Sequence, residues 1–216
     1  MAHALERLVI GDEPDAWRAA GFTVHGDTMR FGKVSVELVG ATGQRGVLGW
    51  KLKDIDNDID GLVTNSAPSV EVVDTTPASL GVHEHTNAVF GIDHVVVETG
   101  DIDRTVAAFE TAGIAERRSA TMQTPSGERR QSFLWAGRVI LEVVGAMEPV
   151  NDKPASIWGL ALVTGNLQTT SHVLDEKLSE PRDAVQPGRK IATMKTKDLD
   201  ISVPIVILSP HVAELL

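Results

Sequence analysis

The chain of 216 residues contains no cysteine. This absence excludes disulfide bonds, thiolate nucleophiles and zinc sites built on thiolates. No apolar run approaches the roughly 20 residues that a helix needs to cross a bilayer. The N-terminal sequence MAHALER also lacks the basic and apolar regions of a signal peptide. These absences predict a cytoplasmic protein that has no membrane partner.

The sequence also has no excess of basic residues. Lys and Arg number 20 against 30 Asp and Glu, which gives a net charge of −10. Nucleic-acid binding requires a basic face for the phosphates, so no nucleic-acid partner is expected. The dinucleotide-binding, Walker and Ser-His-Asp signatures are absent as well. The composition is otherwise that of an ordinary globular protein, and the expected partner is a small molecule.

The most informative feature of the sequence is an internal repeat. The segment FGKVSVELVG at 31–40 is echoed by AGRVILEVVG at 136–145, and each copy predicts a strand with one glutamate that ends at glycine. Apolar runs at 5–10 and 92–97 begin the two copies. Each run is followed by acidic residues typical of a helix start and by a helix that ends at glycine. With further strands expected at 22–24 and within 114–135, the order is βαβββ.

A second type of unit follows each copy, so the chain divides into four modules. We label these modules A (4–42), B (46–74), C (91–146) and D (155–210). Module D is expected to contain a helix ending near Leu178 and strands at 189–194 and 201–208, whereas B stops after a strand at 70–73. The fold class predicted is α+β, with tandem βαβββ modules forming curved mixed sheets around a cleft. The predicted domains are a reduced half at 1–74, a linker at 75–90 and a full half at 91–216.

Paired βαβββ modules resemble the vicinal oxygen chelate superfamily of glyoxalase I, extradiol dioxygenases and bleomycin-resistance proteins. GIDHVVV at 91–97 is similar to that family's first strand, and LEVV at 141–144 to its fourth. The segment 182–193 resembles part of uncharacterised bacterial glyoxalase-like proteins. The resemblance implies one cleft between two modules. It also implies a metal bound by the first and fourth strands of both modules, such as Zn, Ni, Mn or Fe.

His94 and Glu142 match the family's ligand positions in module C. In module D, Leu160 or Ala161 stands opposite His94, and the strand at 203–208 offers no acid or imidazole. Two ligands thus remain where four are usual, so no cofactor is certain. One interpretation is a hydrogen-bonded His94–Glu142 pair that lines the cleft. The other is a weak divalent-metal site, completed by the substrate or by a residue such as His85 or His172.

Several further residues have both a structural and a functional interpretation. Arginines and a glutamine near predicted strand ends are either solvated or form a clamp for an anion. The two tryptophans of the second half pack in a core or wall a pocket. The histidines of His83-Glu84-His85 are solvated, bind metal or lie at the cleft rim. The candidate ligand-binding set is His85, His94, Arg130, Trp135, Glu142, Trp158, Arg182, Gln186 and Arg189.

The acidic segment Asp54–Asp60 superficially suggests a calcium loop. It lacks the glycine and the terminal glutamate that such a loop requires, so helix capping is the preferred interpretation.

Three functions remain open on this sequence. The first is binding of a small anionic or oxygen-rich molecule between modules C and D, with or without metal-independent catalysis. The second is a metal-dependent lyase, isomerase or dioxygenase that uses His94 and Glu142. The third is a non-catalytic scaffold. The chain is expected to be a monomer or a homodimer.

Overall fold

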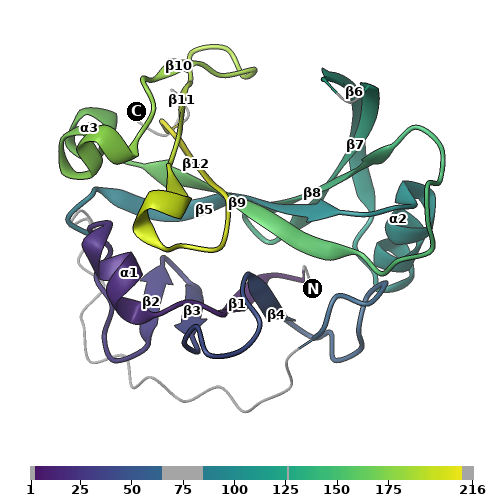
Figure 1. Cartoon of the computed structure of the whole chain (residues 1–216). Coiled ribbons are helices and arrows are strands. Elements are labelled where there is room, and N and C mark those ends of the chain that lie inside the picture. The colour runs from purple at the N-terminus through teal and green to yellow at the C-terminus, as the bar shows by residue number, and fades with distance from the viewer. Residues whose placement is uncertain (1–2, 65–84, 126, 211–216) are drawn as a thin grey trace.

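The computed structural model describes residues 3–64, 85–125 and 127–210. The strand predicted at 70–73, most of the predicted linker and the histidine at position 83 lie outside these residues. The described elements form a large sheet of eight strands and a small sheet of four (Figure 1). No helix in the described ranges is long and apolar enough to cross a membrane.

The large sheet contains two complete βαβββ units and has the strand order β10-β11-β12-β9-β5-β8-β7-β6. In each unit the first strand pairs in parallel with the last. β5 and β9 pair antiparallel and thereby join the units. This topology confirms the predicted fold class, in which βαβββ modules form a curved mixed sheet. Module C comprises β5 (Val89–Glu98), α2 (Ile102–Thr111), β6 (Glu116–Thr124), β7 (Gly127–Ala136) and β8 (Val139–Ala146). Module D comprises β9 (Ser156–Thr164), α3 (Leu167–Leu174), β10 (Arg182–Asp183), β11 (Lys190–Thr193) and β12 (Ile205–Leu208), with short 3-10 helices at Asp175–Lys177 (η1) and Thr196–Leu199 (η2).

The small sheet is a reduced version of the same plan, with the strand order β2-β3-β1-β4. β1 pairs in parallel with β3 and antiparallel with β4, as β5 does with β8 and β9. A single parallel bridge between Trp50 and Thr64 stands where module B would have its last strand. The elements are β1 (Leu5–Ile10), α1 (Pro14–Ala19), β2 (Thr28–Phe31), β3 (Val34–Leu38) and β4 (Val47–Leu52).

Two local predictions in the first half are wrong. Residues 22–24 are not a strand, because the middle strand begins only at Thr28. No helix follows β4 in residues 53–64, so the aspartates of this segment cap none. They make other contacts instead: Asp56 pairs with Lys51 at 2.6 Å, and Asp58 accepts a hydrogen bond from the Thr64 backbone at 2.8 Å.

The helices begin and end as their sequences dictate. Asp101 accepts a hydrogen bond from the Arg104 backbone at the start of α2, and Asn166 does the same for Thr169 in α3. The chain leaves α1 and α2 through Gly21 (φ 79°) and Gly113 (φ 87°). Only glycine adopts this left-handed conformation without strain, so both predicted helix ends are confirmed.

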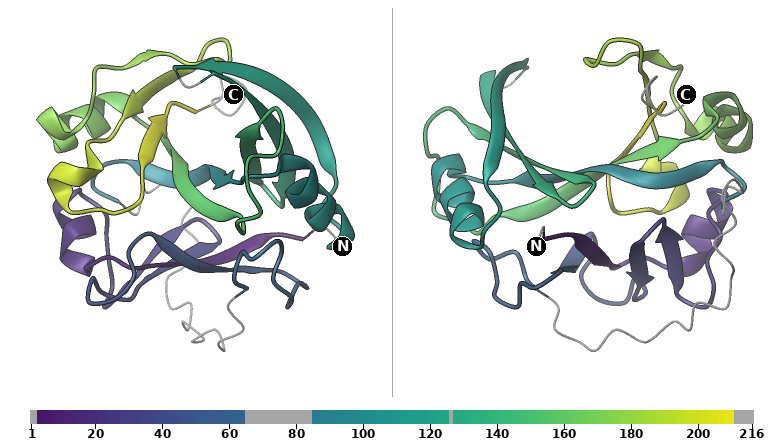
Figure 2. Two further views of the ribbon diagram at one scale, coloured as in Figure 1. Left: turned by 45° about the vertical axis from the view of Figure 1, so that its right-hand side comes forward. Right: turned by 180° about the vertical axis from the view of Figure 1, so that it is seen from behind.

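The large sheet is strongly curved, and the small sheet lies against its outer side (Figures 1 and 2). Side chains alternate between the two faces of a strand. On β8, Val139, Leu141 and Val143 are buried in the core, whereas Ile140 and Glu142 point to the opposite, inner face. One continuous cluster of buried apolar side chains extends through both sheets. Among the described elements, no helix or strand lies over the inner face of the large sheet (Figures 1 and 2).

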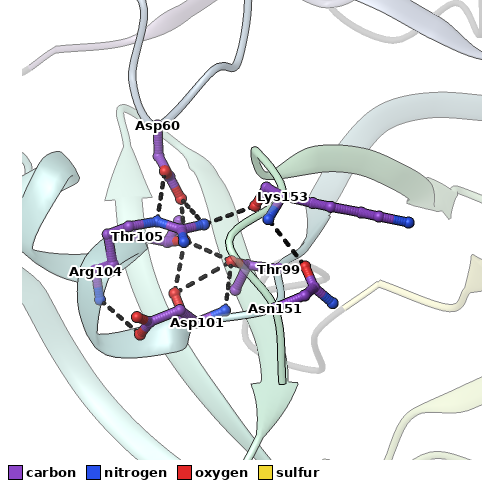
Figure 3. Close-up of polar contacts among 7 residues, drawn as sticks. All are labelled: Asp60, Thr99, Asp101, Arg104, Thr105, Asn151 and Lys153. Carbon is purple, nitrogen blue, oxygen red and sulfur yellow. Dashed lines mark hydrogen bonds and ion pairs between the residues drawn. The ribbon is translucent and has the colours of Figure 1, made fainter. Parts of the chain in front are cut away.

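A polar network fastens the first half to module C (Figure 3). Asp60 receives two hydrogen bonds from the Arg104 guanidinium, at 2.8 and 3.2 Å, and one from the Thr105 hydroxyl. Arg104 also donates to the Lys153 carbonyl at 2.7 Å, and the hydroxyl oxygens of Thr105 and Thr99 lie 2.7 Å apart. The last aspartate of the acidic segment therefore joins the first half to α2, and Arg104 joins α2 to the β8–β9 connection.

Replacing Thr105 by valine tests this network. Thr105 is fully buried, and its loss would leave Asp60 with one hydrogen bond fewer. We expect the free energy of unfolding, measured with urea, to fall by about 1–3 kcal/mol. Thr111→Val on the same helix is the control, because the Thr111 hydroxyl is exposed and bonds only the Ala107 carbonyl. Equal effects of the two changes would contradict this role of the network.

Candidate functional site

The inner, concave face of the large sheet is the candidate site. Strand register places its side chains in lateral rows, because directly opposed residues of neighbouring strands share a face. We define the concave face by two of these rows. The first consists of Trp135, Ile140, His94, Ala161 and Val206, from β7, β8, β5, β9 and β12. The second consists of Arg118, Phe133, Glu142, Val96 and Gly159, from β6, β7, β8, β5 and β9.

His94 lies near the middle of this face and is held by Asp93. The register of β5 against β9 shifts between Ile92 and His94, which makes a bulge at Asp93. Bulges re-aim side chains, and this one brings the Asp93 carboxylate to 2.6 Å from His94 Nδ1. Both side chains are nearly buried. The sequence predicted His94 as a residue of the site but did not predict Asp93.

Arg189 completes the arrangement from the loop before β11. Its guanidinium binds Asp93 with two hydrogen bonds, of 3.0 and 3.3 Å, and donates to Gln186 Oε1 at 3.0 Å. It also donates from Nε to the Ser209 carbonyl at 2.8 Å. Arg189 is only 1% exposed. Two of the predicted ligand-binding residues, Gln186 and Arg189, are thus joined to His94 through Asp93 and act on its position.

The charges of Asp93 and Arg189 determine which nitrogen of the His94 imidazole carries hydrogen. Burial raises the pKa of Asp93, but hydrogen bonds from His94 and Arg189 outweigh it and lower that pKa to about 2. Asp93 is therefore an ionised acceptor, and when the His94 imidazole is neutral its Nδ1 donates to Asp93. The lone pair then resides on Nε2, which has no hydrogen-bond partner among the described residues and is not sealed from solvent.

Glu142 lies one row away from His94 and has its own partner. Gln131 Nε2, on β7, donates to the Glu142 carboxylate. No hydrogen bond joins Glu142 to His94 in the described structure, so the predicted pair is not formed. The two side chains share a face and remain separately held.

Two tryptophans lie at the solvent-facing flanks of the site. Trp135 is 42% exposed and Trp158 is 54% exposed, which shows that their interpretation as core residues is wrong. Trp135 belongs to the His94 row, two strands away. Trp158 walls a cavity of about 420 Å³ that also contacts Val96 and Val206 of the concave face. The rest of this cavity is mainly apolar and lies beside η2 and the start of β12.

The arginines divide between the two faces of the sheet. Arg130 points to the outer face, where it pairs with Asp103 of α2 at 2.5 Å, so it does not belong to the concave face. Its neighbour Arg129 pairs with Glu98 at 3.0 Å beside a second, polar cavity of about 430 Å³. Arg118, which sequence reasoning missed, stacks on the Phe133 ring at 4.6 Å. Arg182 is exposed on the short edge strand β10.

His85 packs against the first half, away from the concave face. Its ring packs between Phe22 and Phe31, with centroids 5.3 and 5.1 Å away. Nδ1 accepts from the Thr23 backbone at 3.0 Å, and Nε2 lies 2.9 Å from the Arg30 carbonyl. Burial lowers its pKa to about 4, although the bond to Arg30 opposes the shift. His85 is therefore a neutral core residue, which excludes the predicted position at the cleft rim.

The side chains of this face do not fit the metal that the family resemblance implies. Among residues 3–64, 85–125 and 127–210, no group of three or more histidine, aspartate or glutamate side chains is placed to hold a metal ion. His94 Nδ1 is engaged by Asp93, and Glu142 by Gln131. The concave-face residues of module D are Gly159, Ala161 and Val206, which have no donor atoms.

A scan of protein-family models and a search of curated protein sequences found no match. Among solved structures, the fold is similar to methylmalonyl-CoA epimerase from Mycobacterium tuberculosis, with 16% identity and a TM-score of 0.45 over 59% of this chain and 93% of that one. It is also similar to a 4-hydroxymandelate synthase variant from Streptomyces coelicolor, with 13% identity and a TM-score of 0.44 over 96% of this chain and 70% of that one. Both are members of the vicinal oxygen chelate superfamily.

Proposed function

We propose that the protein binds a small, flat, oxygen-rich anion on the concave face between modules C and D, through its own side chains. The observation that carries this proposal is a pair of exposed tryptophans: Trp135 lies in the row of His94, and Trp158 lines a cavity that also contacts Val96 and Val206 of the same face. Exposed aromatic rings are costly to leave in water, and they offer stacking surfaces for a planar ligand.

The charges of the face support an anionic ligand. Arg118 has no ion pair within the described part of the chain, and its guanidinium is already oriented by the Phe133 ring. An oriented guanidinium binds a carboxylate in a bidentate manner. The Glu142 carboxylate is already engaged by a hydrogen bond from Gln131. A ligand carboxylate near Arg118 and a ring near Trp135 would occupy neighbouring positions on β6 and β7.

Tryptophan fluorescence tests the proposal directly. The chain has four tryptophans, and Trp17 and Trp50 are fully buried, so quenching by an added ligand reports mainly on the other two. Titration with benzoate should produce saturable quenching. Trp135→Ala and Arg118→Gln should each weaken binding about tenfold, since stacking and a guanidinium contact contribute about 1–3 kcal/mol each.

The matched control is Arg182→Gln, which removes an exposed arginine from β10. This variant should bind benzoate as the unmodified protein does. Quenching that is unchanged by Trp135→Ala, Trp158→Ala and Arg118→Gln would place the ligand elsewhere and overturn the proposal.

A further inference from the structure

We infer that His94 Nε2 accepts a hydrogen bond from a hydroxyl group on the bound ring, so that the site selects hydroxylated flat anions over their ethers. This inference rests on the proposed function, because it assigns the polar contact that the bound molecule makes. It concerns a specificity-determining residue and needs no metal.

The first step is the orientation of the imidazole. Asp93 lies 2.6 Å from Nδ1, and Arg189 holds Asp93 by a bidentate contact from a fully buried position. The ring is also fixed from the side by Phe133, whose centroid lies 6.4 Å away in an edge-to-face arrangement. A histidine with one nitrogen bonded to a carboxylate presents its other nitrogen in a set direction and tautomer.

The second step concerns the hydrogen-bond acceptor, Nε2 of His94. Nε2 has no hydrogen-bond partner among residues 3–64, 85–125 and 127–210, yet it is not a sealed atom. The neighbours of His94 in its row are Ile140 and Ala161, neither of which offers a side-chain donor. An acceptor in such apolar surroundings gains most from a partner that the ligand itself supplies.

The third step is the spacing between His94 and the stacking surface. Trp135 is two strands from His94 in the same row, so their Cα atoms are about 10 Å apart. At this separation a single six-membered ring stacked on the indole can direct one hydroxyl substituent toward the imidazole. The ligand class is therefore a planar ring with an acidic group and a hydroxyl group.

The experiment compares the 3- and 4-hydroxy isomers of benzoate with their methyl ethers at about pH 8, where imidazole is ordinarily neutral. The ethers keep the ring and the carboxylate but cannot donate a hydrogen bond. At least one hydroxybenzoate should bind about tenfold more tightly than its ether, the effect of one well-placed hydrogen bond. In His94→Phe this preference should vanish, so that the affinity ratio is about one.

Three further measurements separate recognition from structural damage. Trp135→Ala should weaken hydroxybenzoate and ether alike and keep their ratio. His172→Phe, which alters an exposed histidine on α3, should change neither affinity. In the unmodified protein, nitrogen NMR should show hydrogen on Nδ1 of His94 and a shift of Nε2 when the hydroxybenzoate binds, which is a readout independent of any variant.

The outcomes distinguish the two proposals. Equal affinities for hydroxybenzoates and ethers in the unmodified protein, with binding still dependent on Trp135, would overturn the role of His94 and leave the proposed function standing. The same conclusion follows if the preference survives in His94→Phe. Failure of benzoate and of all four derivatives to bind would overturn both proposals.

Discussion

Replacing Arg189 by leucine is expected to lower the free energy of unfolding by about 3–5 kcal/mol, the usual cost of removing one partner from a buried ion pair. Arg189 is 1% exposed and its guanidinium is the main counter-charge of Asp93. Without it, a buried carboxylate keeps only the contact to His94. Urea unfolding at neutral pH, monitored by circular dichroism, measures the loss.

Two comparisons show whether the fall in the free energy of unfolding is caused by removal of the ion pair. Arg182→Leu removes an exposed arginine close in sequence and should cost less than about 0.5 kcal/mol. The double variant Asp93→Asn/Arg189→Leu should be less destabilised than the sum of its single changes, because neither then leaves an unpaired charge. Strict additivity, or a loss below about 1 kcal/mol for Arg189→Leu, would contradict the structural role assigned to this pair.

The second large effect is a loss of stability in mild acid. Burial lowers the pKa of His85 from 6.5 to about 4 in the folded protein. Between these values the unfolded chain binds a proton that the folded protein does not, so stability is fully present above about pH 6.5 and falls as the pH approaches 4. The shift corresponds to about 3 kcal/mol at 1.36 kcal/mol per pKa unit.

Urea unfolding in steps from pH 7.5 to pH 4 measures this loss. His85→Gln should lower the stability at pH 7.5, because it disturbs the contacts to Thr23 and Arg30, but should flatten the decline. His172→Gln should leave the decline unchanged, since that side chain is exposed. The lowered pKa of Asp93, about 2, adds a separate loss between about pH 4 and pH 2. A decline that persists in His85→Gln would contradict the assignment.

The fold could be predicted from sequence because its signals are local and repeated. Modules A and C each contain a strand, an acidic helix start and a helix end at glycine, and the duplication at 31–40 and 136–145 repeats the pattern. The reduced first half was harder to predict. Phe22 and Val24 are apolar and buried like strand residues, yet they pack in a connecting segment around His85 and the core.

The site was predicted only in part, because the side of a strand on which a residue lies depends on register. Arg129 and Arg130 are equally plausible in sequence, and a shift of one residue exchanges the two faces. Asp93 reaches His94 only because of a bulge that no local sequence signal marks. Trp135 and Trp158 are expected in a core by hydrophobicity, and only the uncovered inner face of the sheet explains their exposure.

The most direct test of the account is to map where a benzoate ligand binds, by backbone amide shifts in two-dimensional NMR. We expect the largest shifts on the concave face, around His94, Phe133 and Trp135, and at Trp158. The small sheet, including β2 and β3, should be unaffected. Shifts confined to the outer face of the large sheet around Arg130 and Asp103, or to the first half of the chain, would contradict the claim that the concave face of modules C and D is the binding site.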